Sequence, residues 1–131
     1  MDKLFTYGTL RPSLYAHKVG DVVGTPAKLT GFKMFNLGRF PCLVEDDSDG
    51  LEPIVGETIA IPSVTMYDGY EGYPILYNRK EVACHVDKEH DYYIGCWVYF
   101  MEPQMFSQHE ARAIYIPSGD WADVLAKKAQ L

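Results

Sequence analysis

The sequence has no excess of positive charge, no long hydrophobic run and no segment that resembles a signal peptide. Its 131 residues carry a net charge of −6 without a long run of lysine or arginine, which argues against nucleic acid as a partner. No apolar segment approaches the roughly 18 residues that span a bilayer, so no membrane partner is expected. The first residues, MDKLFTYGTL, lack the basic and apolar regions of a signal peptide.

Cysteine is sparse and shows no pairing pattern. Cys42, Cys84 and Cys96 are odd in number, far apart and never in a C-x-x-C arrangement. Such cysteines are typical of free thiols in a reducing compartment, which predicts a cytoplasmic protein. Cys84 precedes His85, but neighbouring residues of a strand point to opposite faces, so the pair is not expected to act as a catalytic dyad.

The common catalytic motifs are also missing. The sequence contains no G-x-S-x-G, no H-E-x-x-H and no P-loop, so the commonest hydrolase and nucleotide-binding functions lack support. Four side chains near one another resemble metal ligands: His85, Asp87, Glu89 and His90. Their spacing matches no zinc signature, and a solvated hairpin tip is the better interpretation. We therefore expect no metal site.

The composition is that of one globular domain over residues 1–131. Hydrophobic residues make up 47% of the chain and aromatic residues 14%, and a domain of this length buries roughly two thirds of its unfolded surface. Apolar and β-branched runs between glycine, proline and acidic turns predict short strands. The predicted strands are Lys3–Tyr7, Ala27–Asn36 with a bulge at Gly31, Pro41–Val44, Ile54–Ile61, Lys80–Val86 and Tyr92–Met101.

Only brief helices are predicted. Residues Pro12–Val19 form a short helix or turn, Ser63 is the expected N-cap of a helix ending near Tyr70, and Trp121–Lys128 form a last helix. DKEHD separates two predicted strands, a pattern typical of an antiparallel hairpin. These elements predict an α+β fold, either a small barrel or a strongly curved sheet with helices at its rim.

The first stretch with chemical potential is YGTLRP, Tyr7–Pro12, directly after the first predicted strand. Gly8 allows the backbone to adopt a positive φ or to approach a ligand closely. Successive N–H groups around such a turn can hold an anion or a developing oxyanion. An ordinary turn explains the same residues, so the stretch alone leaves both interpretations open.

The second stretch is DGYEGYPILYNR, Asp68–Arg79, in which Glu71 lies between Tyr70 and Tyr73 and between two glycines. Small neighbours allow a substrate to come close, and aromatic neighbours exclude water. Loss of water raises the pKa of a carboxyl group, which suits it to act as base and then acid near neutral pH. The alternative is a helix end, with Gly72 after the last turn and Pro74 as the stop signal.

Taken together, these stretches resemble the γ-glutamylcyclotransferase-like family, in its short bacterial-type and γ-glutamylamine cyclotransferase-like branch. The similarity runs from Phe5 to about Trp121. The segments that carry it are YGTLR at Tyr7–Arg11, GTPAKLTGFKMFNLGRFPCLV at Gly24–Val44, Val55-Gly56-Glu57, DGYEG at Asp68–Gly72 with Tyr77-x-Arg79, Trp97-Val98-Tyr99 and SGDW at Ser118–Trp121.

The resemblance implies a small closed mixed β-barrel with short helices and a pocket at one end. It implies that the loop Tyr7-Gly8-Thr9-Leu10 binds a γ-glutamyl group and that Glu71 is the general acid/base. The expected products are 5-oxoproline and a free amine or amino acid, with no metal or organic cofactor. Three departures from the family pattern leave the proposed acid/base untouched but are expected to reshape the pocket wall and the acceptor preference: Tyr67 replaces a usual leucine, Pro12 follows Arg11, and GETIAI replaces a more usual Gly-Glu-Val-Tyr run.

The expected reaction is an intramolecular cyclisation, in which the α-amine of the γ-glutamyl group attacks its own γ-carbonyl. Glu71 would accept the proton of that amine and pass it to the leaving nitrogen. We expect Tyr77 and Arg79 near the pocket, Tyr77 offering its hydroxyl and Arg79 orienting Glu71 or a substrate carboxylate. For Arg79 a structural ion pair on the following strand is slightly the preferred interpretation. For the whole protein the alternative is a catalytically inactive barrel of the same fold that binds a metabolite.

Overall fold

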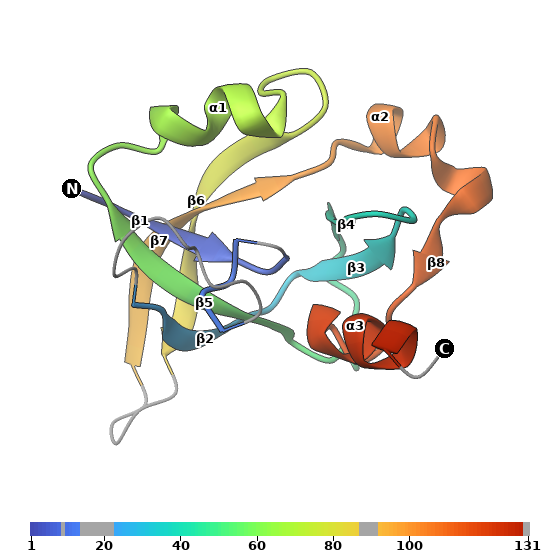
Figure 1. Cartoon of the computed structure of the whole chain (residues 1–131), viewed down its shortest axis with the longest axis horizontal. Coiled ribbons are helices and arrows are strands. Elements are labelled where there is room, and N and C mark those ends of the chain that lie inside the picture. Colours follow the sequence, from blue (N-terminus) through green and yellow to red (C-terminus); the bar gives the residue numbers. More distant parts are fainter. Residues whose placement is uncertain (9, 14–22, 87–91, 130–131) are drawn as a thin grey trace.

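The chain is described here by a computed structural model covering residues 1–8, 10–13, 23–86 and 92–129 (Figure 1). The strands are β1 (Asp2–Thr6), β2 (Thr25–Leu29), β3 (Phe32–Asn36), β4 (Pro41–Glu45), β5 (Ile54–Ile61), β6 (Asn78–Val86), β7 (Tyr92–Phe100) and β8 (Ile114–Tyr115). The helices are α1 (Thr65–Glu71), α2 (Pro103–Ser107) and α3 (Trp121–Ala129), with a 3₁₀ turn at Glu110–Arg112.

Five strands form a closed barrel in the order β1-β5-β2-β6-β7. All neighbouring pairs are antiparallel except the closing one, where β7 lies parallel to β1 and Trp97 pairs with Leu4. The closed mixed barrel and the α+β class are therefore confirmed. The predicted hairpin is also confirmed by the β6–β7 pairing, while its DKEHD tip, 87–91, lies outside the described residues.

A second sheet, in the order β4-β3-β8, lies beside the barrel and corrects one prediction. The single bulged strand expected over Ala27–Asn36 is two strands in different sheets, because β2 pairs with β5 whereas β3 pairs with β4. Gly31 between them has φ +89, a conformation that side chains with a Cβ rarely adopt. The glycine therefore turns the chain out of the barrel, and a run of apolar residues does not distinguish such a corner from a bulge.

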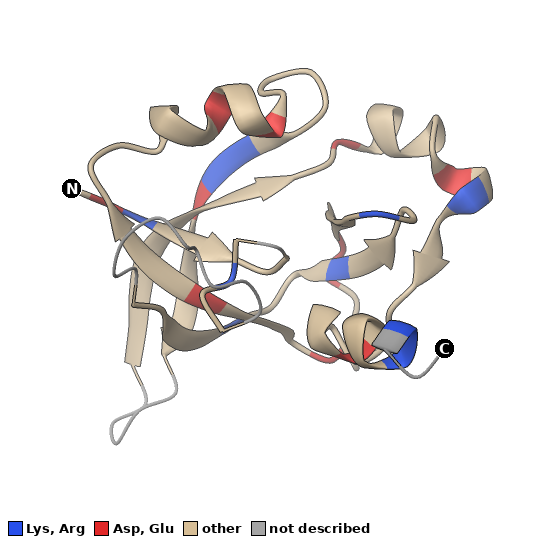
Figure 2. Ribbon diagram, viewed as in Figure 1, with Lys and Arg blue, Asp and Glu red and all other residues tan. Residues whose placement is uncertain are grey.

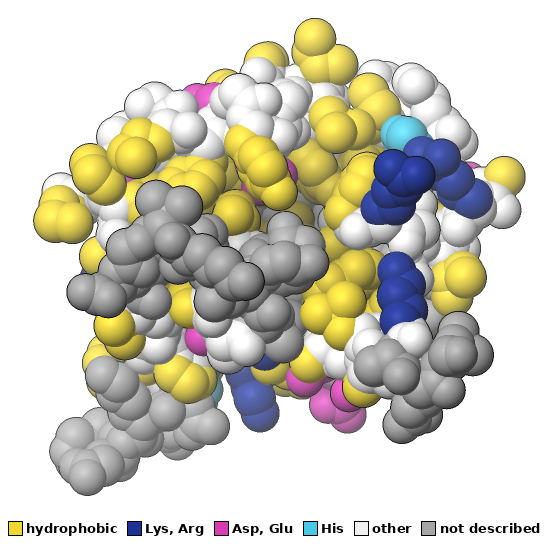
Figure 3. Space-filling view, viewed as in Figure 1, with side chains coloured by type: hydrophobic (Ala, Val, Ile, Leu, Met, Phe, Trp, Pro, Cys, Tyr) yellow, Lys and Arg dark blue, Asp and Glu magenta, His cyan; other side chains and the backbone are white. Residues whose placement is uncertain are grey.

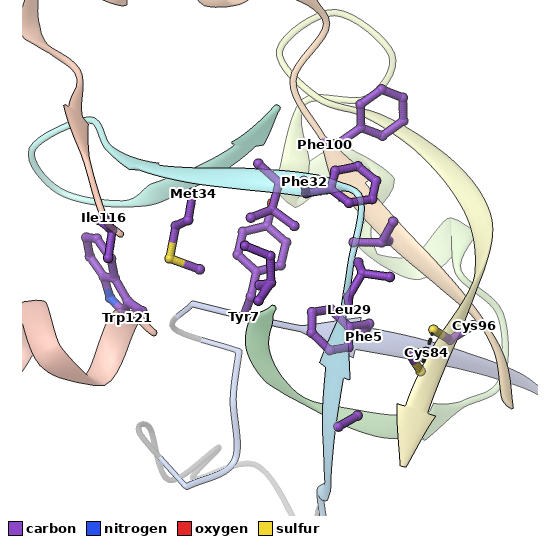
Figure 4. Close-up of a cluster of buried hydrophobic side chains, with 14 residues drawn as sticks. Phe5, Tyr7, Leu29, Phe32, Met34, Cys84, Cys96, Phe100, Ile116 and Trp121 are labelled. Atoms are coloured by element: carbon purple, nitrogen blue, oxygen red, sulfur yellow. Dashed lines mark hydrogen bonds between the residues drawn. The ribbon is translucent and has the colours of Figure 1, made fainter. Parts of the chain in front are cut away.

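The interior consists of two clusters of buried apolar side chains. One extends from Phe5 and Tyr7 through Leu29 and Met34 to Trp121, joining the barrel to the second sheet and to α3 (Figure 4). The three cysteines are buried free thiols, as predicted, and the Cys96 Sγ lies 3.0 Å from the Cys84 Sγ in this cluster. The other cluster packs α1 against the barrel through Val64, Tyr77 and Tyr99.

The helices follow the predictions with one correction at the start of α1. The N-cap is Val64 rather than Ser63, although the Thr65 N–H donates to the Ser63 Oγ at 3.3 Å. The Val64 N–H donates instead to the Asp2 Oδ2 of β1 at 2.8 Å, so a contact distant in sequence fixes the start of the helix. The last helix matches its prediction, whereas α2, the 3₁₀ turn and β8 were not predicted. Most of Pro12–Val19 lies outside the described residues. No helix in the described ranges is long and apolar enough to cross a membrane.

Candidate active site

A pocket of about 310 Å³ opens between the end of β1, the beginning of β4 and the C-terminal end of α1. Figure 3 shows hydrophobic side chains gathered over this face beneath α1. The pocket includes five of the predicted site residues, namely Tyr7, Gly8, Leu10, Glu71 and Tyr77. Thr9 lies outside the described residues, and Arg79 is not in the lining. The rest of the lining is Leu4, Phe5, Thr6, Phe40, Pro41, Tyr70, Leu76 and Tyr99.

Glu71 is the acidic side chain of this pocket. It is partly buried and, among the described residues, has no hydrogen bond or ion pair. Burial disfavours the ionised carboxylate and raises the pKa of Glu71 to about 7. A carboxyl group with this pKa is about half ionised near neutral pH, so it can both accept and donate a proton.

The end of α1 explains how Glu71 comes to face the pocket. Glu71 is the last helical residue, and Gly72 follows in the left-handed conformation with φ 67 and ψ 30. The N–H of Gly72 and that of Tyr73 donate to carbonyls of the last turn, which closes the helix. The helix-end interpretation of this stretch is therefore confirmed, and it is compatible with the active-site interpretation because the helix end presents the carboxylate to the pocket.

Three buried tyrosines surround the pocket, and each uses its phenolic hydrogen within the protein. Tyr7 donates to the Tyr99 carbonyl oxygen at 2.7 Å, and Tyr77 donates to the Pro41 carbonyl oxygen at 2.8 Å. Tyr99 donates to the Asp68 Oδ1 at 2.7 Å and lies 3.1 Å from the Val64 carbonyl oxygen. Burial raises the pKa of all three phenols, so they remain protonated. Each phenolic oxygen keeps lone pairs with which it can accept a hydrogen bond.

Tyr99 is a buried tyrosine of the pocket that the sequence analysis did not select. Its segment, Trp97-Val98-Tyr99, was among those that carried the family resemblance, but nothing in the sequence assigned it to the pocket. Alternation along β7 gives no such signal, because Val98, Tyr99 and Phe100 are all buried. Only closure of the barrel through β7 and β1 brings Tyr99 beside Tyr7.

Arg79 adopts the alternative role, a structural ion pair. Its Nε and Nη2 donate to the two carboxylate oxygens of Asp68 at 2.8 and 3.1 Å. The guanidinium also lies over the rings of Tyr73 and Trp97, 4.3 and 4.9 Å from their centres. The hydrogen bonds from Arg79 lower the pKa of Asp68. Figure 2 shows the corresponding arrangement, with acidic positions on α1 beside basic positions at the start of β6. Arg79 thus ties α1, and with it Glu71, to the barrel.

Two details of the predicted pocket wall need correction. Of the tyrosines flanking Glu71, Tyr70 lines the pocket, but Tyr73 covers Arg79 and the pocket wall comes instead from Tyr7, Tyr77 and Tyr99. Gly8 does not have a positive φ. It permits close approach: a Cβ at position 8 would lie 2.9 Å from the Pro41 Cγ. Sequence neighbours of Glu71 were a poor guide because a helix sends adjacent residues in different directions.

No candidate metal centre is found among the described residues, where no group of three or more His, Cys, Asp or Glu could hold an ion. Of the four side chains that resembled ligands in the sequence, only His85 is described.

Comparison with known proteins gives a family and a fold. The family described as gamma-glutamyl cyclotransferase, AIG2-like, matches residues 4–123. A mouse AIG2-like protein of known crystal structure superimposes with a TM-score of 0.63 at 22% identity, covering 81% of this chain and 82% of that one. An Arabidopsis thaliana protein with a solution structure superimposes with a TM-score of 0.61 at 23% identity, covering 80% of this chain and 74% of that one. At these identities the two structures show the fold alone. A search of the curated proteins found no match to the sequence. The match over almost the whole chain shows that this protein belongs to the gamma-glutamyl cyclotransferase, AIG2-like family.

Proposed function

We propose that this protein cyclises a γ-glutamyl group and releases 5-oxoproline together with a free amine or amino acid. The family supports a cyclotransferase-type activity on small γ-glutamyl compounds. The observation that carries the specific proposal is Glu71, a carboxyl group in the pocket whose burial raises its pKa to about 7. A structural carboxylate is normally paired or exposed to water, whereas Glu71 is partly buried and has no partner among the described residues.

The pocket suits the two ends of a γ-glutamyl group differently. The phenolic oxygens of Tyr7, Tyr77 and Tyr99 and the Glu71 carboxylate are hydrogen-bond acceptors, which suits the α-ammonium group of the substrate. For an α-carboxylate or an oxyanion we assign the turn that begins at Gly8, because backbone N–H groups around such a turn can hold an anion. We therefore expect the substrate amine near Glu71 and its anionic oxygens near the turn.

In the proposed reaction Glu71 first accepts a proton from the α-ammonium group. The freed nitrogen lone pair attacks the γ-carbonyl carbon, and a new C–N bond closes the five-membered lactam. The bond from that carbon to the leaving nitrogen then breaks, and Glu71 returns its proton to the leaving nitrogen. No external nucleophile enters, so the protein acts by holding the flexible chain folded and by moving one proton.

The pH profile provides a direct prediction. Because Glu71 must be ionised to accept the proton, kcat/KM should rise with pH through a midpoint near 7, the pKa to which burial raises this group. Stopped assays of 5-oxoproline release between pH 5 and pH 9 measure this midpoint. A midpoint below pH 5 would mean that the pocket does not desolvate the acid.

The outer part of the pocket predicts the preferred leaving amine. Leu10, Phe40 and Leu76 are half-buried and Tyr70 is exposed, and all four line the pocket. Covering them with an apolar leaving group gains roughly 25 cal/mol per Å² of buried apolar surface. A carboxylate there would lose water beside Glu71, and the described lining contains no lysine or arginine to pair with it.

We therefore expect γ-glutamylphenethylamide to be cyclised with a kcat/KM about tenfold above that of γ-glutamylphenylalanine, which differs only by a carboxylate. Equal or reversed values would contradict the assignment of the outer pocket. Tight binding of 5-oxoproline without turnover of any γ-glutamyl compound would instead favour the metabolite-binding alternative.

A further inference from the structure

Three segments singled out in the sequence, YGTLR, Val55-Gly56-Glu57 and SGDW, have charged residues that the proposed chemistry does not use. In the structure these residues meet. The Arg11 Nε donates to the Glu57 Oε2 at 3.3 Å, and the Arg11 Nη1 donates to the Asp120 Oδ1 at 2.8 Å. The Arg11 side chain is 9% exposed and that of Glu57 is 8% exposed, so water does little to screen this pair.

The cluster of Arg11, Glu57 and Asp120 holds both ends of the turn after β1. Thr6, the last residue of β1, pairs with Glu57 in the barrel ladder and donates its hydroxyl to the Glu57 carbonyl oxygen at 2.9 Å. At the other end the Arg11 N–H donates to the Gly8 carbonyl oxygen at 3.0 Å. Ser13 adds its N–H and its hydroxyl as donors to the Glu57 Oε2. Gly8 and Arg11 are thus joined by a backbone hydrogen bond, and Arg11 is tied to Glu57 on β5.

The far side of the cluster is equally well supported. Asp120 accepts a hydrogen bond from the Ala122 N–H at 2.9 Å and so begins α3 with a side-chain cap. Gly119, with φ +67, brings the chain so close to β5 that a Cβ would lie 2.5 Å from the Pro53 carbonyl oxygen. The Val55 N–H donates to the Gly119 carbonyl oxygen at 2.8 Å. Both carboxylates that face Arg11 are therefore fixed by neighbouring backbone.

We infer that Arg11, Glu57 and Asp120 are positioning residues that hold the Gly8–Arg11 turn in the shape that binds the γ-glutamyl group. None of the three lines the pocket, but Gly8 and Leu10 do, and they lie within the turn that the cluster closes. A buried ion pair is weak evidence for a gain in stability, because removing the charges from water costs about as much as their attraction returns. Its fixed directions nevertheless select one conformation of the turn, which is what an anion-binding backbone requires. The binding part of this inference rests on the proposed function.

The test uses Glu57→Gln and Asp120→Asn, which keep the side-chain shapes and leave Arg11 in place. Lys80→Gln is the control, because Lys80 forms an exposed ion pair with Glu45. We expect Glu57→Gln to accelerate hydrogen exchange at the Arg11 amide at least tenfold and to weaken 5-oxoproline binding, measured by calorimetry, at least tenfold. Asp120→Asn should have a smaller effect, because asparagine still caps α3 and still accepts a hydrogen bond. Lys80→Gln should change neither quantity.

A merely structural role would lower the melting temperature without changing the affinity of the folded protein. If hydrogen exchange at the Arg11 amide is unchanged in folded Glu57→Gln, the cluster does not hold the turn. If exchange is faster but the affinity for 5-oxoproline is unchanged, the cluster holds the turn but does not position it for binding. The rising limb of the pH profile should stay near pH 7 in both variants, because Glu71 lies outside this cluster. If Glu57→Gln does not fold, Asp120→Asn and Arg11→Lys supply the same comparison. Wild-type protein that neither binds nor releases 5-oxoproline would refute the proposed function. The exchange measurement would still show whether Arg11, Glu57 and Asp120 hold the turn.

Discussion

Replacing Glu71 by glutamine should lower kcat by a factor of about 10² to 10⁴ while leaving the fold intact. General acid–base catalysis by a positioned side chain contributes rate factors of that size. Glutamine keeps the size and the helical position of the residue at the end of α1, so only proton transfer is lost. The measurement is 5-oxoproline release from a good γ-glutamyl substrate. Glu81→Gln is a matched control, because Glu81 is an exposed acid on β6 that does not line the pocket.

The same variant has a second expected effect, on stability. Burial raises the pKa of Glu71 from its ordinary 4.5 to about 7, so between these values the folded state keeps a proton that the unfolded state has lost. The contribution of Glu71 to the stability of the wild type should therefore fall as pH rises from 4.5 to 7 and stay low above it. At about 1.4 kcal/mol per pKa unit the loss is at most about 3.5 kcal/mol.

Glu71→Gln carries no such penalty and should be more stable than wild type at pH 8, with the difference disappearing near pH 4. Urea denaturation at the two pH values measures it. Near wild-type turnover in the variant would remove Glu71 from the role of acid/base. A variant less stable than wild type at pH 8 would show that the carboxylate has a favourable partner.

Replacing Gly8 by valine should abolish measurable binding of 5-oxoproline, a loss of at least tenfold in affinity. A Cβ at position 8 would lie 2.9 Å from the Pro41 Cγ and 3.2 Å from its Cδ, and Pro41 is itself part of the pocket wall. The added methyl groups must therefore displace either the turn or the beginning of β4. Calorimetry with 5-oxoproline measures the effect, and circular dichroism confirms that the variant is folded.

Gly95→Val is the matched control for this variant. Gly95 also lies in the barrel, on β7, but a Cβ there would meet no other atom within 4 Å. Valine at position 95 should therefore leave the affinity unchanged. If Gly8→Val binds 5-oxoproline as tightly as Gly95→Val does, the turn after β1 is not the γ-glutamyl-binding loop.

The sequence by itself determined most of the secondary structure and the main chemical candidates. Strand β5 matches its predicted bounds, the β6–β7 hairpin and α3 match closely, and the family resemblance led to the closed mixed barrel. Local patterns sufficed here because alternation, turn residues and helix-ending glycines act over a few neighbouring positions. Glu71 could be proposed for the same reason, because the five residues DGYEG already show an acid next to a glycine at a helix end.

Only the tertiary structure decided which residues share the pocket and which fasten it. Tyr99 lines the pocket although the sequence did not indicate it, whereas Tyr73 packs on the Arg79 guanidinium and does not line the pocket. The strand expected over Ala27–Asn36 divided between two sheets at Gly31. Glu57 and Asp120 lie 46 and 109 residues from Arg11 along the chain, yet the three side chains form one cluster in which Arg11 and Glu57 are buried. Barrel closure brings such positions together, and no local pattern in the sequence records which distant side chains will meet.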